Sequence, residues 1–155
     1  MPRPLALLLL LACAKDPPAQ TGDTGGATGP GTLRLSFAMD ADLVPTMAEA
    51  ATGTFRGSIY AEADASAVGP NDGAVALFDF EAPGIAMDAG GEDSAVALTT
   101  EPLDAAVVWV LGCLDTAGDD CECGDPITIP NENKVAVPAA TETPITVTMS
   151  LLHPC

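Results

Sequence analysis

Residues Leu33–Asp40 read LRLSFAMD, and this stretch decides the fold because large apolar side chains alternate along it with polar or small ones. A period of two places alternate side chains on opposite faces of a strand, so that one face packs on a core and the other faces solvent. The same alternation recurs in Phe55–Asp64 and in Ile145–Leu151. We expect all three segments to be strands.

Shorter apolar runs and turn-forming residues fill the chain between these segments. Gly, Pro, Asn and Asp cluster at Gly69–Gly73, Asp88–Asp93 and Pro130–Asn133, where they favour reversals. Seven or so short strands with frequent turns are typical of a β-sandwich or barrel. The sequence therefore predicts an all-β fold, a single antiparallel β-sandwich over Leu33–Cys155. The shorter runs are Val75–Phe80, Ala95–Thr99, Ala106–Leu114 and Val135–Val137.

Two segments depart from the simple alternation. Ala106–Leu114 is apolar at both odd and even positions, which is typical of a strand covered on both faces. We expect it to be the central strand of the core. Asp40–Thr52 has no period of two, and Thr46–Glu49 resembles the start of a helix, with Thr46 able to cap toward Glu49. We expect a loop there with at most one helical turn.

The charge of the chain excludes one class of partner. Its 155 residues include 5 Lys and Arg against 22 Asp and Glu, a formal charge of −17. Because nucleic-acid affinity comes mainly from Lys and Arg that neutralise phosphates, we expect no nucleic-acid partner. The 48% hydrophobic residues are nevertheless enough for one domain with a core.

The N-terminal residues predict export and a lipid anchor. Leu5–Ala12 is an apolar run of eight residues, too short to span a bilayer and typical of the core of a signal peptide. Residues 10–13, LLAC, resemble the lipobox of bacterial lipoproteins. This resemblance implies that residues 1–12 are a signal peptide and that Cys13 is lipidated after cleavage. Lipid chains would then hold the acidic chain at the membrane, which its surface charge cannot do.

Ala14–Thr32 follows the lipidated position and is rich in Gly, Pro and Thr, without hydrophobic periodicity. This composition predicts a flexible tether from Cys13 to Thr32. In the lipoproteins that the leader resembles, a residue other than Asp directly after the cysteine favours the outer membrane, and here that residue is Ala14. We therefore expect a protein of the cell envelope that meets the membrane through its N-terminal anchor.

The remaining cysteines predict a disulfide framework. An even number of cysteines in an exported chain indicates disulfides, here two. A bridge between Cys121 and Cys123 would close a strained ring of three residues, which leaves two pairings. Cys113 bonds either Cys121 or Cys123, and Cys155 bonds the other. A thiolate metal site is the alternative, but the Cys-x-Cys spacing, the oxidising location and the lack of a nearby histidine argue against it.

An acidic loop lies between these cysteines. Residues 115–125 hold five carboxylates and no cation, and calcium is a physical reason to concentrate carboxylates because it takes six to eight oxygen ligands. The alternative is a solvated acidic loop stapled by the disulfides. The candidate ligands are Asp115, Asp119, Asp120, Glu122 and Asp125.

Val108–Pro130 also resembles the strand, acidic loop and Gly-Asp-Pro turn of transthyretin-like and surface-adhesin B-type sandwiches. The resemblance implies calcium ligands at Asp115, Asp119 and Asp125. The sequence departs from that pattern at residues 116–118, Thr-Ala-Gly, where the calcium-binding versions alternate Asp or Asn. Calcium is the one cofactor that we consider.

The sequence favours binding over catalysis. His153 is the single histidine and lies beside Pro154 and Cys155, and the chain holds no Gly-x-Ser-x-Gly, His-Glu-x-x-His or phosphate-loop motif. We expect a non-catalytic binding or adhesion-type module of the cell envelope, with an unknown protein or ligand as partner. A structural or accessory lipoprotein of an envelope complex is the main alternative. A small hydrolase that uses paired acids is a remote one.

Two surface features would separate the first two functions. A contiguous exposed apolar patch would favour the accessory role, because such patches mark protein contacts. A concave face with Tyr60 or Trp109 exposed would favour ligand binding.

Overall fold

The all-β prediction is confirmed by a computed structural model, which describes residues 28–40, 42–43, 51–87 and 96–155. Over these ranges the chain forms ten strands and two 3-10 helices, η2 (Glu62–Asp64) and η3 (Pro130–Asn133). The strands are β1 (Thr32–Met39), β2 (Thr52–Ala61), β3 (Ala65–Ser66), β4 (Gly69–Pro70), β5 (Phe78–Ala86), β6 (Leu98–Thr99), β7 (Val107–Asp115), β8 (Pro126–Thr128), β9 (Lys134–Ala136) and β10 (Glu142–Leu152).

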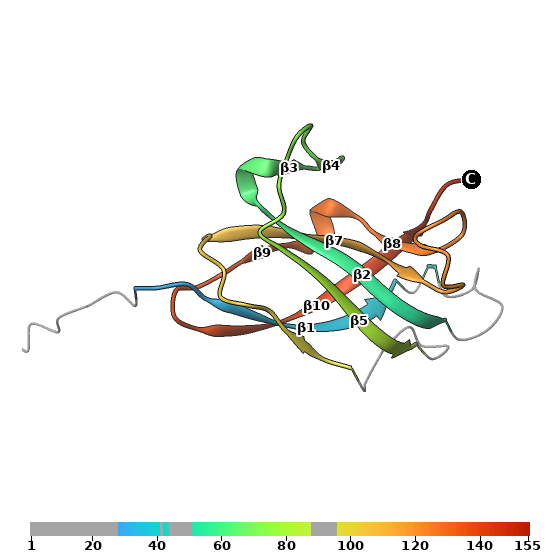
Figure 1. Cartoon of the computed structure of the whole chain (residues 1–155), viewed down its shortest axis with the longest axis horizontal. Helices are drawn as coiled ribbons and strands as arrows, with labels where there is room; N and C mark the ends of the chain where they lie inside the picture. Colours follow the sequence, from blue (N-terminus) through green and yellow to red (C-terminus); the bar gives the residue numbers. More distant parts are fainter. Residues whose placement is uncertain (1–27, 41, 44–50, 88–95) are drawn as a thin grey trace, which may run out of the picture.

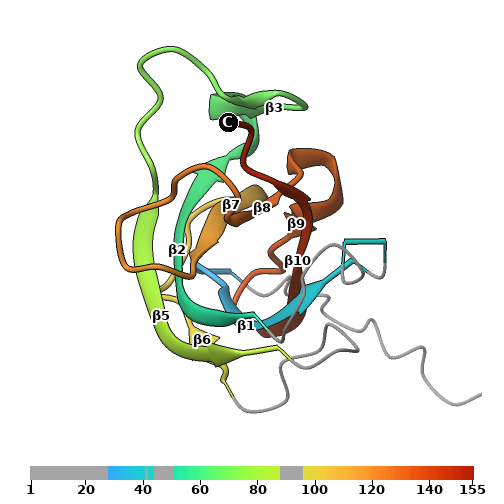
Figure 2. The same cartoon turned by 90° about the vertical axis from the view of Figure 1, so that its right-hand side faces the viewer.

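Eight of these strands form one curled sheet. Its order is β5-β2-β7-β8-β10-β1-β6, and β9 pairs with β7 beside this path. Figure 2 shows the strands arranged round a common centre, so that the sheet is a nearly closed barrel. β3 and β4 form a separate hairpin on the outside, which Figure 1 shows standing above β2 and β7.

The sheet differs from the predicted antiparallel sandwich in two respects. It is a single curled sheet, and β1 pairs in parallel with β10 over eight residue pairs, from Thr32 with Glu142 to Met39 with Met149. The reason is that the period of two sets which face is buried but not the direction of the neighbouring strand. Strands joined by a tight turn must run antiparallel, whereas β1 and β10 are far apart in the chain and free to run in parallel.

The predicted strands agree with the structure to different degrees. Those at Leu33–Asp40, Ala106–Leu114, Val135–Val137 and Ile145–Leu151 correspond to β1, β7, β9 and β10. The strand predicted for Phe55–Asp64 begins earlier, at Thr52, and its last three residues form η2. Residues 75–80 are strand only from Phe78 onward, and the described part of 95–99, residues 96–99, is strand only at Leu98–Thr99.

Other features were missed or lie elsewhere. The alternation did not predict the three-residue β8 or the β3–β4 hairpin. The turn predicted for Gly69–Gly73 is confirmed at its second half, where Ala74 N–H donates to the Asn71 carbonyl at 3.0 Å, whereas Gly69 and Pro70 form β4. The predicted turn at Pro130–Asn133 is η3. The leader, Cys13, most of the tether, Thr46–Glu49 and Asp88–Asp93 lie outside the described residues.

Side chains fill the interior of the barrel. Phe55 is fully buried, and its ring centroid lies 4.8 Å from that of Phe37 and 5.8 Å from that of Phe80. Gly57 and Gly112 pair directly across β2 and β7, and a Cβ on either would lie 2.7 Å from a ring carbon of Phe55. The two glycines therefore leave room for that ring, and the barrel has a packed core, as small barrels generally do.

β7 is the central strand, as predicted. It pairs with β2 on one side and with β8 and β9 on the other. Val108, Val110 and Leu114 face the core and are fully buried. On the outer face Trp109 is 6% exposed, because η2 and β9 cover it: its Nε1 donates to the carbonyl of Glu62 at 3.2 Å, and the Lys134 Nζ lies 4.9 Å from its ring centroid.

Two disulfides are confirmed, in one of the two predicted pairings. Cys113 bonds Cys121 with a Cα–Cα distance of 6.0 Å, and Cys123 bonds Cys155 at 4.6 Å. The chain after β10 runs beside the acidic loop, where His153 N–H donates to the Asp125 carbonyl at 2.7 Å. This contact brings Cys155 to Cys123 and leaves Cys121 for Cys113.

The helices of the described ranges are 3-10 turns of three and four residues. None of them has the length and apolar character needed to cross a membrane.

The pairing can be read by mass spectrometry, because Glu122 is the one residue between Cys121 and Cys123. Cleavage after glutamate, without reduction and at mildly acidic pH, should release residues 93–122 as one internally bridged peptide, because the bond before Pro102 resists cleavage, with 123–132 linked to 143–155. The other pairing would join all three peptides.

Replacing the cysteines of each bridge by serine should cost roughly 3 kcal/mol for Cys113–Cys121 and roughly 4 kcal/mol for Cys123–Cys155, because the cost rises with the logarithm of loop length.

Candidate functional site

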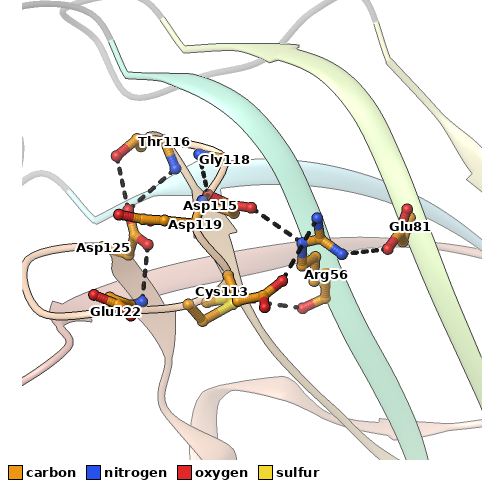
Figure 3. Close-up of polar contacts among 11 residues, drawn as sticks. Arg56, Glu81, Cys113, Asp115, Thr116, Gly118, Asp119, Glu122 and Asp125 are labelled. Atoms are coloured by element: carbon orange, nitrogen blue, oxygen red, sulfur yellow. Dashed lines mark hydrogen bonds and ion pairs between the residues drawn. A yellow bond between two sulfur atoms is a disulfide. The ribbon is translucent and has the colours of Figure 1, made fainter.

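The acidic loop is held from within by two buried carboxylates. Asp115 ends β7 and Asp125 precedes β8, and they are 3% and 4% exposed. Asp115 Oδ1 accepts the N–H groups of Gly118 at 2.6 Å and Asp119 at 3.3 Å. These bonds close the first turn of the loop onto the end of the strand (Figure 3).

Asp125 organises the other half of the loop. Its Oδ1 accepts the N–H of Thr116 at 3.1 Å and the hydroxyl of Thr116 at 2.7 Å. Its Oδ2 accepts the N–H of Glu122 at 3.2 Å. Both oxygens of a buried carboxylate are thus satisfied by donors of the loop itself, which burial of such a group requires (Figure 3).

Arg56 supplies the cation that the loop lacks in sequence. It lies on β2 opposite Cys113, and its Nε donates to Asp115 Oδ2 at 3.1 Å. One terminal nitrogen pairs with Glu81 on β5, and the other lies 3.8 Å from Asp120 Oδ1. Figure 3 shows the guanidinium between Glu81 of β5 and Asp115 of β7. The third carboxylate, Asp120, belongs to the loop.

The pKa of each partner is shifted by this contact. Burial raises the pKa of Asp115, but the hydrogen bonds from Gly118, Arg56 and Asp119 together outweigh burial, so that the pKa is lowered overall from 3.8. The pKa of Arg56 is raised, chiefly by its hydrogen bond to Asp115 and then by the charge of Glu81. Both groups are therefore charged at neutral pH.

Three of the five candidate calcium ligands come together. Asp115, Asp119 and Asp125 each offer an oxygen, and these atoms lie within 4.8 Å of one another. Glu122 and Asp120 lie apart from them: Glu122 is exposed, and the Asp120 side chain is 88% exposed and directed toward Arg56.

Hydrogen-bond donors already occupy the carboxylate oxygens that a calcium ion would need. A calcium ion takes six to eight oxygens and would have to displace N–H groups and the guanidinium that already point at Asp115 and Asp125. The geometry thus favours the alternative to a calcium site, an acidic loop held by the disulfides. The calcium site remains a prediction.

A groove on the outer wall is a second candidate site, which the sequence did not reveal. It consists of two adjoining hollows of about 600 and 490 Å³ between the β3–β4 hairpin and the strands β2, β7 and β8. Pro70, Leu111, Gly112 and Ile127 line both hollows. No signal in the sequence could locate the groove, because its walls come from residues 56–81, 111–130 and 151, which only the folded sheet brings together.

The two hollows differ in character. The first is lined on its polar side by Ser58, Tyr60 and Asp79. The second is lined by aliphatic residues, among them Val68, which is 94% exposed, and Leu151, which is 51% exposed. Of the two aromatic residues considered for ligand binding, Trp109 is buried and Tyr60 is half-buried and lines the groove.

We expect the Arg56→Gln variant to melt at a lower temperature than the wild type at pH 7, because Asp115 stays buried without its guanidinium. Arg34→Gln is the matched control: Arg34 is an exposed cation on β1, and its loss should shift Tm by no more than about 2 °C.

Because the native pKa of Asp115 is lowered, ionised Asp115 stabilises the fold above about pH 4, and this stabilisation is lost as pH falls through the native pKa. The Tm difference between wild type and Asp115→Asn should therefore shrink from pH 7 to pH 2, and a constant difference would contradict the assignment.

A thermal melt in EDTA and in about 10 mM calcium tests the ion site. Because internal donors occupy Asp115 and Asp125, we expect Tm to change by less than about 2 °C. An ion bound with a dissociation constant near 0.1 mM would add roughly 2.7 kcal/mol, a shift of about 10 °C. A shift of that size, abolished by Asp119→Ala but not by Asp72→Ala, would establish a calcium site instead.

Comparison of the chain with protein-family models, with curated proteins and with solved structures found no match.

Proposed function

We propose that this chain is an exported lipoprotein, anchored through Cys13 to the outer membrane, and that its barrel is a non-catalytic binding module of the cell envelope. The lipobox-like residues 10–13 support the anchor. The two disulfides support an oxidising compartment, since structural disulfides persist in exported proteins.

The direction of the strands supports an orientation at the membrane. β1 begins at Thr32, and Gly31 pairs with Leu103 at the same end of the barrel. β7 ends at Asp115 at the opposite end, where the chain after β10 also finishes beside the acidic loop (Figure 1). A tether from Cys13 would therefore join the barrel at the end opposite the acidic loop.

The groove is the observation that carries the proposal. Its two hollows are shallow and open to solvent, and they combine apolar walls with a few polar groups, as binding surfaces do. Since side chains fill the barrel, the outer wall is where a partner can be bound. The charged groups at the groove are held in place, Arg56 by three carboxylates and Asp79 by the hydroxyl of Ser58, and this arrangement supports binding over proton transfer.

A structural role in an envelope complex is favoured by a different observation. Val75 and Leu77 are 77% and 44% exposed, and they lie outside both hollows on the connection from β4 to β5. Exposed aliphatic residues that lie close together in the chain are one mark of a surface that a partner protein covers. This role would place the main contact on that connection instead of the groove.

Two measurements test the proposal in the cell of origin. The intact mass of the chain extracted from membranes should show cleavage before Cys13 and added acyl groups, and Cys13→Ser should lack them. A photo-crosslinking residue at position 68, in the groove, should join a partner that the same residue at position 34, on β1, does not. An unmodified Cys13 would refute the anchor, and crosslinks from position 75 alone would favour the structural role.

A further inference from the structure

The aliphatic half of the groove offers an apolar surface to the side chains of a partner. Val68 and Leu151 are two of the four large apolar side chains that are exposed in the described ranges, and both line the same hollow. Leu111 and Ile127 form its floor on the outer faces of β7 and β8. Aliphatic residues that are exposed for no particular reason are scattered over a protein surface. Their grouping in one hollow therefore marks a contact surface.

The other half of the groove carries an unbalanced negative charge. Asp79 Oδ1 accepts the Ser58 hydroxyl at 2.6 Å, and in the described part of the chain no ion pair neutralises Asp79. The neighbouring Arg56 is already shared by Asp115, Glu81 and Asp120. An incoming cation would therefore find a free carboxylate beside Tyr60.

The charge of the whole chain selects among occupants of this groove. With a net charge of −17, two copies of the chain repel each other, and so do the chain and an anionic lipid surface. A cationic partner is instead attracted over a long range and bound faster.

The shape of the groove fits an extended chain. Its two hollows adjoin through Pro70, Leu111, Gly112 and Ile127, one mainly aliphatic and one acidic. Alternate side chains of an extended segment point to the same side, about 7 Å apart, so that neighbouring hollows can take two of them.

We propose that the groove binds an extended segment of a partner protein in which an aliphatic side chain and a Lys or Arg side chain stand two residues apart, the aliphatic side chain against Val68 and Leu151 and the cation beside Asp79. This inference rests on the proposed function of the barrel as a binding module and names the chemistry of its partner.

Three fluorescein-labelled peptides test the inference on the full chain, purified from membranes in mild detergent with its disulfides intact. Their repeats are Leu-Ser-Lys-Ser, Ser-Ser-Lys-Ser and Leu-Ser-Glu-Ser, each over eight residues, and we call them the Leu-Lys, Ser-Lys and Leu-Glu peptides after the side chains that share one face. Fluorescence anisotropy should show the Leu-Lys peptide binding at least about tenfold tighter than the Ser-Lys peptide, since the latter lacks apolar contacts. The Leu-Glu peptide should not bind.

Matched variants assign the binding to the groove. Val68→Asp should weaken binding of the Leu-Lys peptide by about tenfold, whereas Val75→Asp, at an equally exposed valine outside the groove, should leave it unchanged. Asp79→Asn should weaken binding by about threefold at low salt and much less in 0.5 M salt, and Asp72→Asn should have no effect. Equal melting temperatures of the four variants would show that the fold is intact.

Several outcomes would overturn the inference. Equal binding of the Leu-Lys and Ser-Lys peptides, or equal effects of Val68→Asp and Val75→Asp, would show attraction by charge alone. Concentration-dependent dimers that Val68→Asp abolishes would make a second copy the occupant. If the peptides fail while position 68 still crosslinks a partner in the envelope, the partner chemistry is wrong and the binding module stands, whereas loss of both results would refute both proposals.

Discussion

Strand β7 is apolar on both faces, so both faces must be covered. The positions of the hairpin, the acidic loop and the groove depend on what covers its outer face. Its inner face packs in the barrel through Val108, Val110 and Leu114. Its outer face is covered in two places: η2 and β9 lie over Trp109, and the acidic loop folds back over Cys113 and Asp115. Leu111 lies between the two covers, and the groove is the gap that they leave.

A strongly acidic chain can bury a carboxylate only where hydrogen-bond donors contact its oxygens. For the acidic loop a single cation, Arg56, is enough. One guanidinium on β2 reaches carboxylates of β5, β7 and the loop that follows β7, so that parts of the chain distant from Arg56 in sequence share one charge. Backbone N–H groups of the loop provide the remaining donors. The disulfide from Cys113 to Cys121 holds the loop where these bonds can form. Covalent and electrostatic constraints thus act on the same eleven residues.

The candidate site was only partly visible in the sequence. The pattern of carboxylates at 115–125 identified the loop but not its cation, because Arg56 comes 59 residues before Asp115. The groove was missed altogether, since its aliphatic residues belong to a hairpin, two strands and the end of a third. Each of these residues taken alone is an ordinary surface or strand residue. They form one surface because the sheet closes and places the hairpin above β7.

The amino-acid sequence by itself determined the all-β class, the buried face of Leu33–Asp40, the central position of β7 and the two-disulfide framework, because these depend on local periodicity, on composition and on the number of cysteines. Only the tertiary structure decided the parallel pairing of β1 with β10, the choice between two disulfide pairings, the ion pair of Arg56 with Asp115, and the groove. These features join residues far apart in the chain. Periodicity shows which side of a strand is buried, but a neighbour and its direction are set by how the whole sheet closes around its core.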